Sequence, residues 1–179
     1  MACDPLLFAK RKGLQMERRM MTRIVRAGAT LALLSGLVGC AAIHSDDGSS
    51  ISLERSRCYG SCSAYRFTLY ADDHYMWQGR ANVSITGPVR GRMDAGTYAA
   101  AKKLLLAAQY LEFNDSYQDG NACEIWQTDN QTVKIEVADA IGSKTIAHYL
   151  GCKGFARQED LARLEEGLDK IFGTHRFVR

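Results

Sequence analysis

The sequence of 179 residues lacks the short motifs that identify the common catalytic classes. It contains no His-Glu-x-x-His, no Gly-x-Ser-x-Gly, no phosphate-binding loop and no dinucleotide-binding glycine pattern. It also shows no internal repeat, and no apolar run reaches the roughly 20 residues that cross a bilayer as a helix. We therefore predict no catalytic residue, no metal site and no cofactor, and we favour a protein without enzymatic activity.

The stretch from Arg23 to Cys40 has the pattern of a secretory signal. Basic residues precede an apolar run over residues 27–38, and the run leads into Leu-Val-Gly-Cys, which resembles a bacterial lipobox with Cys40 as the lipidated residue. A transmembrane helix or a buried core helix is the alternative interpretation. Against it, the run is short for a bilayer and polar residues interrupt it.

This signal divides the chain into four parts. We expect residues 1–20 to be an upstream extension from a mis-assigned start, and residues 21–39 to be the lipoprotein signal peptide. Residues 40–50 would be the lipidated cysteine and a flexible tether, because they are small, polar and without periodicity. Residues 51–175 would then form a single domain, which is long enough to bury a core.

The formal net charge of +3 depends on the leader. Residues 1–39 hold seven of the 23 lysines and arginines but only two of the 20 acidic residues, so residues 40–179 carry a net charge of about −2. No cluster of basic side chains that could neutralise several phosphates follows Cys40. The sequence therefore argues against a nucleic-acid partner.

Four of the six cysteines lie in the expected domain: Cys58, Cys62, Cys123 and Cys152. An even number of cysteines in an exported chain indicates disulfides, and four cysteines allow three pairings that the sequence alone cannot separate. We predict that Cys58 pairs with Cys62, because Gly60 gives the short loop the backbone freedom that tight closure needs. Cys123 would then pair with Cys152 by elimination.

Two other uses of these cysteines stay open. Cys58 and Cys62 could form a redox-active dithiol, although such sites usually lie at a helix N-terminus and here a strand is expected to follow. The four cysteines could instead bind zinc. Such sites usually contain two close pairs, whereas Cys123 and Cys152 are far apart in the sequence.

Alternation of apolar and polar residues predicts several strands. The alternating runs are residues 51–53, 65–70, 74–78 and 82–86, with residues 89–93 as a short extension. A further pair, residues 131–138 and 144–150, has the spacing of a hairpin. Pro88 has no backbone N–H and therefore cannot donate a hydrogen bond within a central strand of a sheet. We interpret residues 111–130 as a loop that is held in place by Cys123.

Two segments have the period of amphipathic helices. The first follows Asp94, a good N-cap, and its apolar stripe is Tyr98, Ala101, Leu104, Leu105 and Ala108. The second covers residues 158–172, with acidic residues in its first turn and Gly173 after its last residue. The pattern predicts an α+β domain with an antiparallel sheet of about six strands and two helices packed on one face.

Four short stretches of the expected domain are distinctive: Leu53-Glu54-Arg55, Cys58-Tyr59-Gly60-Ser61-Cys62-Ser63-Ala64-Tyr65, Trp77-Gln78-Gly79 and His148-Tyr149-Leu150-Gly151-Cys152-Lys153-Gly154. Together they resemble an uncharacterised bacterial family, domain of unknown function 6438. The likeness covers about residues 51–172 and departs from the family at Ser63, where proline is usual. The resemblance implies an exported or lipid-anchored protein and supplies no catalytic residue.

Four residues are candidates for binding. Tyr59 and Gly60 lie in the cysteine loop, and Tyr70 is expected on the face of the sheet opposite the core. Exposed tyrosines are enriched where proteins bind partners, although strands also favour aromatics for packing alone. His148 could be a ligand or a base, but we favour a hydrogen-bonded structural histidine, because no carboxylate lies at a diagnostic spacing.

We favour a lipid-anchored binding module of the bacterial cell envelope. Its partners would be the membrane, through Cys40, and another envelope protein. Ala41, in place of an aspartate after Cys40, favours the outer membrane, facing the periplasm. The alternatives are an envelope thiol-redox or other enzyme that uses Cys58, Cys62 and His148, and a purely structural envelope component.

Overall fold

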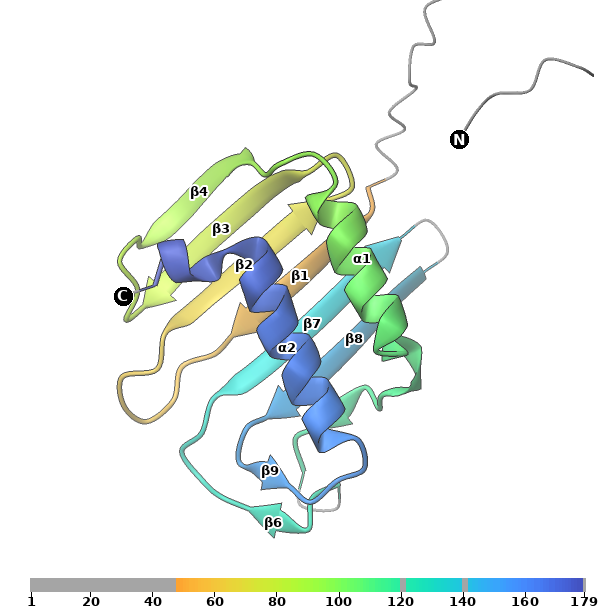
Figure 1. Ribbon diagram of the computed structural model, residues 1–179. Helices are drawn as coiled ribbons and strands as arrows, with labels where there is room; N and C mark the ends of the chain where they lie inside the picture. Colours follow the sequence, from red (N-terminus) through yellow and green to blue (C-terminus); the bar gives the residue numbers. More distant parts are fainter. Residues whose placement is uncertain (1–47, 120–121, 140–141, 179) are drawn as a thin grey trace, which may run out of the picture. The chain divides into compact units, whose positions relative to one another are not determined.

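The computed structural model describes residues 48–119, 122–139 and 142–178 (Figure 1). The predicted upstream extension, the signal peptide, Cys40 and most of the tether lie outside these residues. In the part of the chain that is described, no helix is both long enough and apolar enough to cross a bilayer.

Seven strands of the described chain form one sheet in the order β4-β3-β2-β1-β7-β8-β5. They are β1 Ser50–Arg55, β2 Ala64–Tyr70, β3 His74–Ala81, β4 Gly87–Arg92, β5 Ser116–Tyr117, β7 Thr132–Asp139 and β8 Gly142–Tyr149. All neighbours are antiparallel except β5, which runs parallel to β8. A separate antiparallel ribbon joins β6 Ile125–Trp126 to β9 Cys152–Lys153.

Two helices, α1 Thr97–Ala107 and α2 Gln158–Phe172, cross the same face of the sheet (Figure 1). Two short 3₁₀ turns follow them, η1 Tyr110–Glu112 and η2 Thr174–Arg176. The largest fully buried side chains lie between these layers: Ile51, Leu53, Phe67, Leu69, Trp77, Leu105, Ile135, Ile146, Leu161, Leu164, Leu168 and Phe172. The predicted α+β class is therefore confirmed.

The opposite face of the sheet is polar, because side chains alternate between the two faces of each strand. Arg66 forms ion pairs with both Glu54 and Glu136, and Arg80 also pairs with Glu54. Burial alone would raise the pKa of Glu54. Hydrogen bonds from Arg80 and Arg66, together with their positive charges, outweigh it and hold that pKa below its usual value.

The predicted strand over residues 82–86 is wrong. Asn82 has a left-handed backbone, and Nε1 of Trp77 donates a hydrogen bond to the carbonyl of Ile85 at 2.9 Å, so the segment turns back on β3. The fourth strand is β4, which contains Pro88. β4 lies at the sheet edge and bonds to one neighbour only, and an edge strand tolerates the missing amide of proline.

The predicted N-cap at Asp94 is also wrong. Helix α1 begins at Thr97, and the carboxylate of Asp73 accepts hydrogen bonds from the backbone amides of Gly96 and Tyr98, both at 2.7 Å. Asp73 lies in the turn between β2 and β3. The helix is therefore capped by a side chain that lies more than twenty residues earlier in the chain.

The stretch from residue 111 to 130 is more ordered than the predicted loop. It contains the end of η1 and the two-residue strands β5 and β6. Runs of two residues carry no readable period, which is why β5, β6 and β9 escaped prediction. Cys123 does pin this stretch, because it forms a disulfide with Cys152.

Candidate functional site

Both predicted disulfides are present. The Cα atoms of Cys58 and Cys62 lie 5.7 Å apart, and those of Cys123 and Cys152 lie 5.1 Å apart. The zinc interpretation does not fit this arrangement, because all four thiols are bonded in pairs. Within the described ranges, no three His, Cys, Asp or Glu side chains gather in a way that could hold a metal ion.

Residues 57–62, the cysteine loop, lie in the connection between β1 and β2 and carry the most exposed aromatic side chain of the described chain. Tyr59 is 90 % exposed. Gly60 has a φ of +144°, a conformation that side-chain-bearing residues rarely adopt. The disulfide therefore closes a tight turn that presents Tyr59 to solvent.

The base of the cysteine loop is closed by Gln131 as well as by the disulfide. Nε2 of Gln131 donates hydrogen bonds to the carbonyls of Ser56 at 2.7 Å and Ser63 at 2.8 Å, one on each side of the loop. Gln131 is only 8 % exposed. A buried amide with two partners holds both ends of the loop in register.

Ser63, where the resembled family usually has proline, contributes to the same base. Its hydroxyl donates a hydrogen bond to the carbonyl of Asn82 at 2.8 Å, and Nδ2 of Asn82 donates to the carbonyl of Cys62 at 3.1 Å. Proline could not donate the first of these bonds. The serine thus links the cysteine loop to the turn that follows β3.

The surroundings of Cys58 and Cys62 differ from those of typical catalytic dithiols. The loop connects strand β1 to strand β2, so neither cysteine lies in the first turn of a helix, the position in which the helix dipole lowers the pKa of a catalytic thiol. Both cysteines are half-buried. The geometry favours a structural clasp at this position.

The structure does not bring the four candidate binding residues into one site. Tyr59 and Gly60 share the cysteine loop, whereas Tyr70 lies at the other end of β2, roughly 20 Å away at about 3.3 Å per residue. His148 lies on β8 and is 2 % exposed. Tyr70 belongs to the polar face of the sheet, and His148 belongs to the core.

His148 has a buried carboxylate partner that sequence spacing did not reveal. Its Nδ1 lies 2.8 Å from Oε1 of Glu165, a residue of α2. The rings of Tyr117 and Phe155 stand edge-on to the imidazole, and Nε2 has no hydrogen-bond partner in the described part of the chain. Such an enclosed imidazole cannot reach a substrate, and it fits the favoured structural reading.

A second buried polar cluster was missed entirely by sequence reasoning. Arg55, Tyr65 and Thr174 all bond to the carboxylate of Asp169 on α2. Burial, followed by the negative charge of Asp169, raises the pKa of the Tyr65 hydroxyl well above its ordinary value. The cluster ties α2 to β1 and β2, and its members lie too far apart in the sequence to form a motif.

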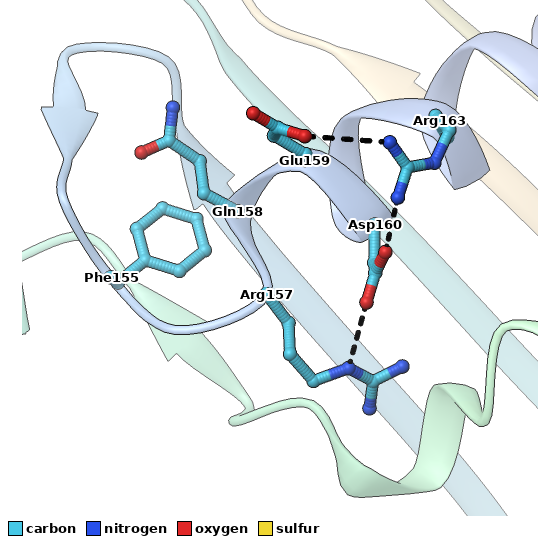
Figure 2. Close-up of a pocket in the computed structure, with 6 residues that line it drawn as sticks. All are labelled: Phe155, Arg157, Gln158, Glu159, Asp160 and Arg163. Carbon is cyan, nitrogen blue, oxygen red and sulfur yellow. Dashed lines mark hydrogen bonds and ion pairs between the residues drawn. The ribbon is translucent and has the colours of Figure 1, made fainter.

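A pocket at the start of α2 is lined by Phe155, Arg157, Gln158, Glu159, Asp160 and Arg163 (Figure 2). Figure 2 shows Asp160 between the two arginines, and Arg163 also pairs with Glu159. Arg157 further donates to the carbonyl of Ala108 at 2.6 Å. The charged lining residues thus pair with one another and offer no unpaired charge to a ligand.

The ribbon of β6 and β9 provides a second exposed aromatic surface. Trp126 is 44 % exposed and Ile125 is 55 % exposed. Sequence reasoning placed both in a featureless loop. The sequence did contain a signal for this surface, since Ile125 and Trp126 are two adjacent apolar residues within a polar stretch. The stretch has no helical or strand periodicity that would predict their burial in the core.

The model of one protein family, described as Domain of unknown function (DUF6438), matches residues 49–172. The match includes the cysteine loop, both disulfides and both helices. The search of the curated proteins found no match.

Proposed function

The chain belongs to the family of DUF6438 domains, and we propose that it works as a lipid-anchored binding module of the bacterial cell envelope, with the cysteine loop as its contact element. The proposal rests on one observation: Tyr59 is exposed on a loop that is closed both by the Cys58–Cys62 disulfide and by the hydrogen bonds of Gln131.

A rigid loop with an exposed tyrosine suits protein recognition. Tyrosine is among the residues that contribute most to binding energy at interfaces. The disulfide and the Gln131 clamp limit the conformations of the loop, so little conformational entropy would be lost on binding. We therefore propose another envelope protein as the partner of this loop.

The lipobox and the two disulfides support the proposed location. Disulfides persist in oxidising compartments such as the bacterial periplasm, and the sequence before residue 48 carries the export pattern and Cys40. Under this proposal the lipid at Cys40 holds the domain at the outer membrane, facing the periplasm.

Photo-cross-linking tests the contact element. A photoreactive amino acid replaces Tyr59 in the full chain in its native cells, and the matched control replaces Leu111, which is 64 % exposed and lies outside the cysteine loop. We expect one discrete protein adduct from position 59 and none from position 111. Equal adduct patterns from both positions would show that the loop is not the contact element.

Mass measurement tests the anchor and the thiols. The protein is extracted from membranes, and its cysteines are alkylated before and after reduction. We expect a diacylglyceryl modification on Cys40 and no alkylation of Cys58 or Cys62 before reduction. An unmodified Cys40 contradicts the anchor, and ready alkylation of the two loop cysteines would favour the thiol-redox alternative.

A further inference from the structure

The solvent side of α1 differs from that of its neighbour α2. On α2 the exposed residues are all charged: Glu159, Arg163, Glu166 and Lys170. On α1 they are three alanines, two lysines and a leucine: Ala99, Ala100, Ala107, Lys102, Lys103 and Leu106. The outer side of a surface helix normally carries polar and charged residues, so the apolar side chains on α1 indicate a contact outside the domain.

Two leucines supply most of the apolar area. Leu106 is 58 % exposed, and Leu111, in η1 just after α1, is 64 % exposed. No other leucine or isoleucine of the described chain is as exposed as these two. Gln109, between them, has a left-handed φ of 51°, and its amide donates to the carbonyl of Leu106 at 3.0 Å. The chain therefore turns tightly, and both leucines lie at the same end of α1. We call the exposed side of α1 together with Leu111 the α1 surface.

The only charged residues within residues 97–111 are Lys102 and Lys103. Neither has an ion pair or a hydrogen bond to its side chain in the part of the chain that the structure describes. The α1 surface therefore combines apolar side chains with unpaired positive charges. This combination is complementary to a bilayer, which offers apolar chains beneath anionic headgroups.

Helix α1 begins where the chain enters the domain. The amide of Ala71 donates a hydrogen bond to the carbonyl of Ser49 at 3.0 Å. Asp73, in the same turn, binds the backbone amides of Gly96 and Tyr98 at the start of α1. The segment that leads into β1 and the first turn of α1 are therefore held by one turn.

The other end of α1 is fixed to the same end of the sheet. Nζ of Lys144 donates a hydrogen bond to the carbonyl of Phe113, directly after η1, at 2.8 Å. Lys144 lies near the start of β8, and the preceding strand β7 ends beside the start of β1, where Ala138 pairs with Ser50. Both ends of the α1 segment are thus bonded to the end of the sheet from which the chain continues toward Cys40.

The distances make a shared membrane possible. The chain between Cys40 and Ser49 spans at most about 30 Å when fully extended, and α1 is about 16 Å long. A bilayer that holds a lipid on Cys40 is therefore within reach of the α1 surface. The cysteine loop follows Arg55 at the other end of β1, roughly 17 Å from Ser50. A contact through α1 leaves that loop uncovered.

We propose that the α1 surface lies on the membrane in which Cys40 is anchored, with Leu106 and Leu111 among the headgroups and Lys102 and Lys103 against lipid phosphates. The inference rests on the proposed lipid anchor. It adds a second contact, which orients the domain so that the cysteine loop stays accessible to a protein partner.

Quenching by brominated lipid tests the contact. The lipidated full chain is bound to vesicles of equal parts phosphatidylglycerol and phosphatidylcholine with brominated chains, and the protein that floats with the vesicles is measured. Leu106→Trp places the reporter, in a Trp126→Phe background whose remaining Trp77 is fully buried. Its fluorescence should fall by at least about half relative to unbrominated vesicles, because apolar side chains of an interfacial helix lie about 5–10 Å into the headgroup and acyl boundary.

The matched control is Tyr59→Trp in the same background, which places the reporter in the cysteine loop. Its fluorescence should be the same in brominated and unbrominated vesicles. Quenching of equal strength at positions 59 and 106 would show that the domain has no fixed orientation, and it would overturn the proposal.

Further variants of the Leu106→Trp protein test the other members of the surface. Lys102→Glu/Lys103→Glu should remove most of the quenching, because it reverses the charge that faces anionic headgroups. Lys102→Arg/Lys103→Arg keeps the charge and should retain the quenching. Leu111→Asp should weaken it, because a carboxylate would enter the headgroup region. A urea midpoint equal to that of the parent shows that each variant is folded.

The outcomes separate this inference from the proposed function. Protein that does not float with the vesicles overturns the anchor and this inference with it. Floating protein without quenching at position 106 overturns this inference alone, as does quenching that neither the lysine reversal nor Leu111→Asp changes. An emission shift at position 106 that follows protein concentration and not bromination would make the α1 surface an interface between copies of this chain.

Discussion

Arg55 on β1 and Asp169 on α2 form an ion pair in which Nε and Nη2 of the arginine both bond to Oδ2 of the aspartate, at 3.0 and 2.6 Å. The second carboxylate oxygen, Oδ1, accepts hydrogen bonds from the hydroxyls of Tyr65 and Thr174. The charged side chains are 17 % and 19 % exposed. A single carboxylate therefore holds α2 against two strands and against the C-terminal turn η2.

Asp169→Asn should strongly destabilise the domain. The substitution leaves the guanidinium of Arg55 largely buried without its counter-ion, and breaking such a pair costs about 3 kcal/mol. Urea unfolding of the oxidised protein gives the free energy of unfolding. The matched control is Asp160→Asn on the same helix, whose ion pairs are more exposed and should contribute much less to the free energy of unfolding. Equal losses in the two variants would contradict the role assigned to Asp169.

Tyr65 should make the domain less stable in alkaline solution. Burial and the charge of Asp169 raise the pKa of Tyr65 in the folded protein, whereas an unfolded tyrosine titrates near pH 10. The unfolded chain therefore loses this proton first. The stabilising contribution is complete below about pH 10 and declines as the pH rises toward the folded pKa.

Urea midpoints measured from about pH 8 to about pH 11 test this linkage. The parent protein should lose more stability over this range than Tyr65→Phe, which has no proton to lose at that position. The comparison removes the contribution of the other tyrosines and the lysines, because both proteins contain them. Parallel pH profiles for the two proteins would exclude Tyr65 as the source.

Asp73, and not Asp94, should control the stability of the start of α1. Asp73→Gly removes both hydrogen bonds to the helix N-terminus, while glycine accepts the left-handed φ of 66° at this position. The expected loss is about 1 kcal/mol, the usual contribution of an N-cap. Asp94→Ala should change the free energy of unfolding by less than about 0.5 kcal/mol. Urea unfolding distinguishes the two, and the reverse order would restore Asp94 as the cap.

The elements that local pattern predicted correctly are those with one apolar face over several turns or strand residues. Helix α2 spans residues 158–172 as predicted, because its apolar residues recur at helical spacing and Gly173 ends it in a left-handed conformation. The alternation of apolar and polar residues along β2 and β7 predicted these two strands equally well. The structure of these elements is determined by residues that lie close together in the sequence, so the periodicity of one segment is enough to predict it.

The errors arose where distant residues decide the local structure. Residues 82–86 alternate like a strand, but Trp77 binds the carbonyl of Ile85 and the segment turns. Asp94 has the right chemistry for a cap, yet the tertiary fold places Asp73 closer to the helix amides. Both outcomes depend on side chains that only the folded chain brings together.

The candidate site shows the same division. Cysteine spacing and a glycine were enough to predict the Cys58–Cys62 bond. The clamp by Gln131 could not be predicted, because its two acceptors lie 75 and 68 residues away in the chain. The partner of His148 is likewise on another element, 17 residues on. Short-range chemistry was readable, and the contacts that make the loop rigid were not.

The two disulfides should differ in their contribution to stability. In the chain-entropy description, a disulfide stabilises more when it closes a longer loop of the unfolded chain. Cys123 and Cys152 are 29 residues apart, and Cys58 and Cys62 are four apart. The double variant Cys123→Ala/Cys152→Ala should therefore lose about 3–4 kcal/mol, and Cys58→Ala/Cys62→Ala about 2 kcal/mol.

Gln131 gives this comparison a second arm, because its amide closes the cysteine loop independently of the sulfurs. If the Gln131 side chain holds the base of the loop, Gln131→Ala should lower the free energy of unfolding more in the Cys58→Ala/Cys62→Ala variant than in the parent. In the parent the disulfide still closes the loop when the Gln131 hydrogen bonds are lost, so the two effects are not additive. Urea unfolding of the four proteins gives this coupling energy. Strict additivity would mean that the disulfide and the clamp act on separate parts of the fold, and the loop would then owe its rigidity to the disulfide alone.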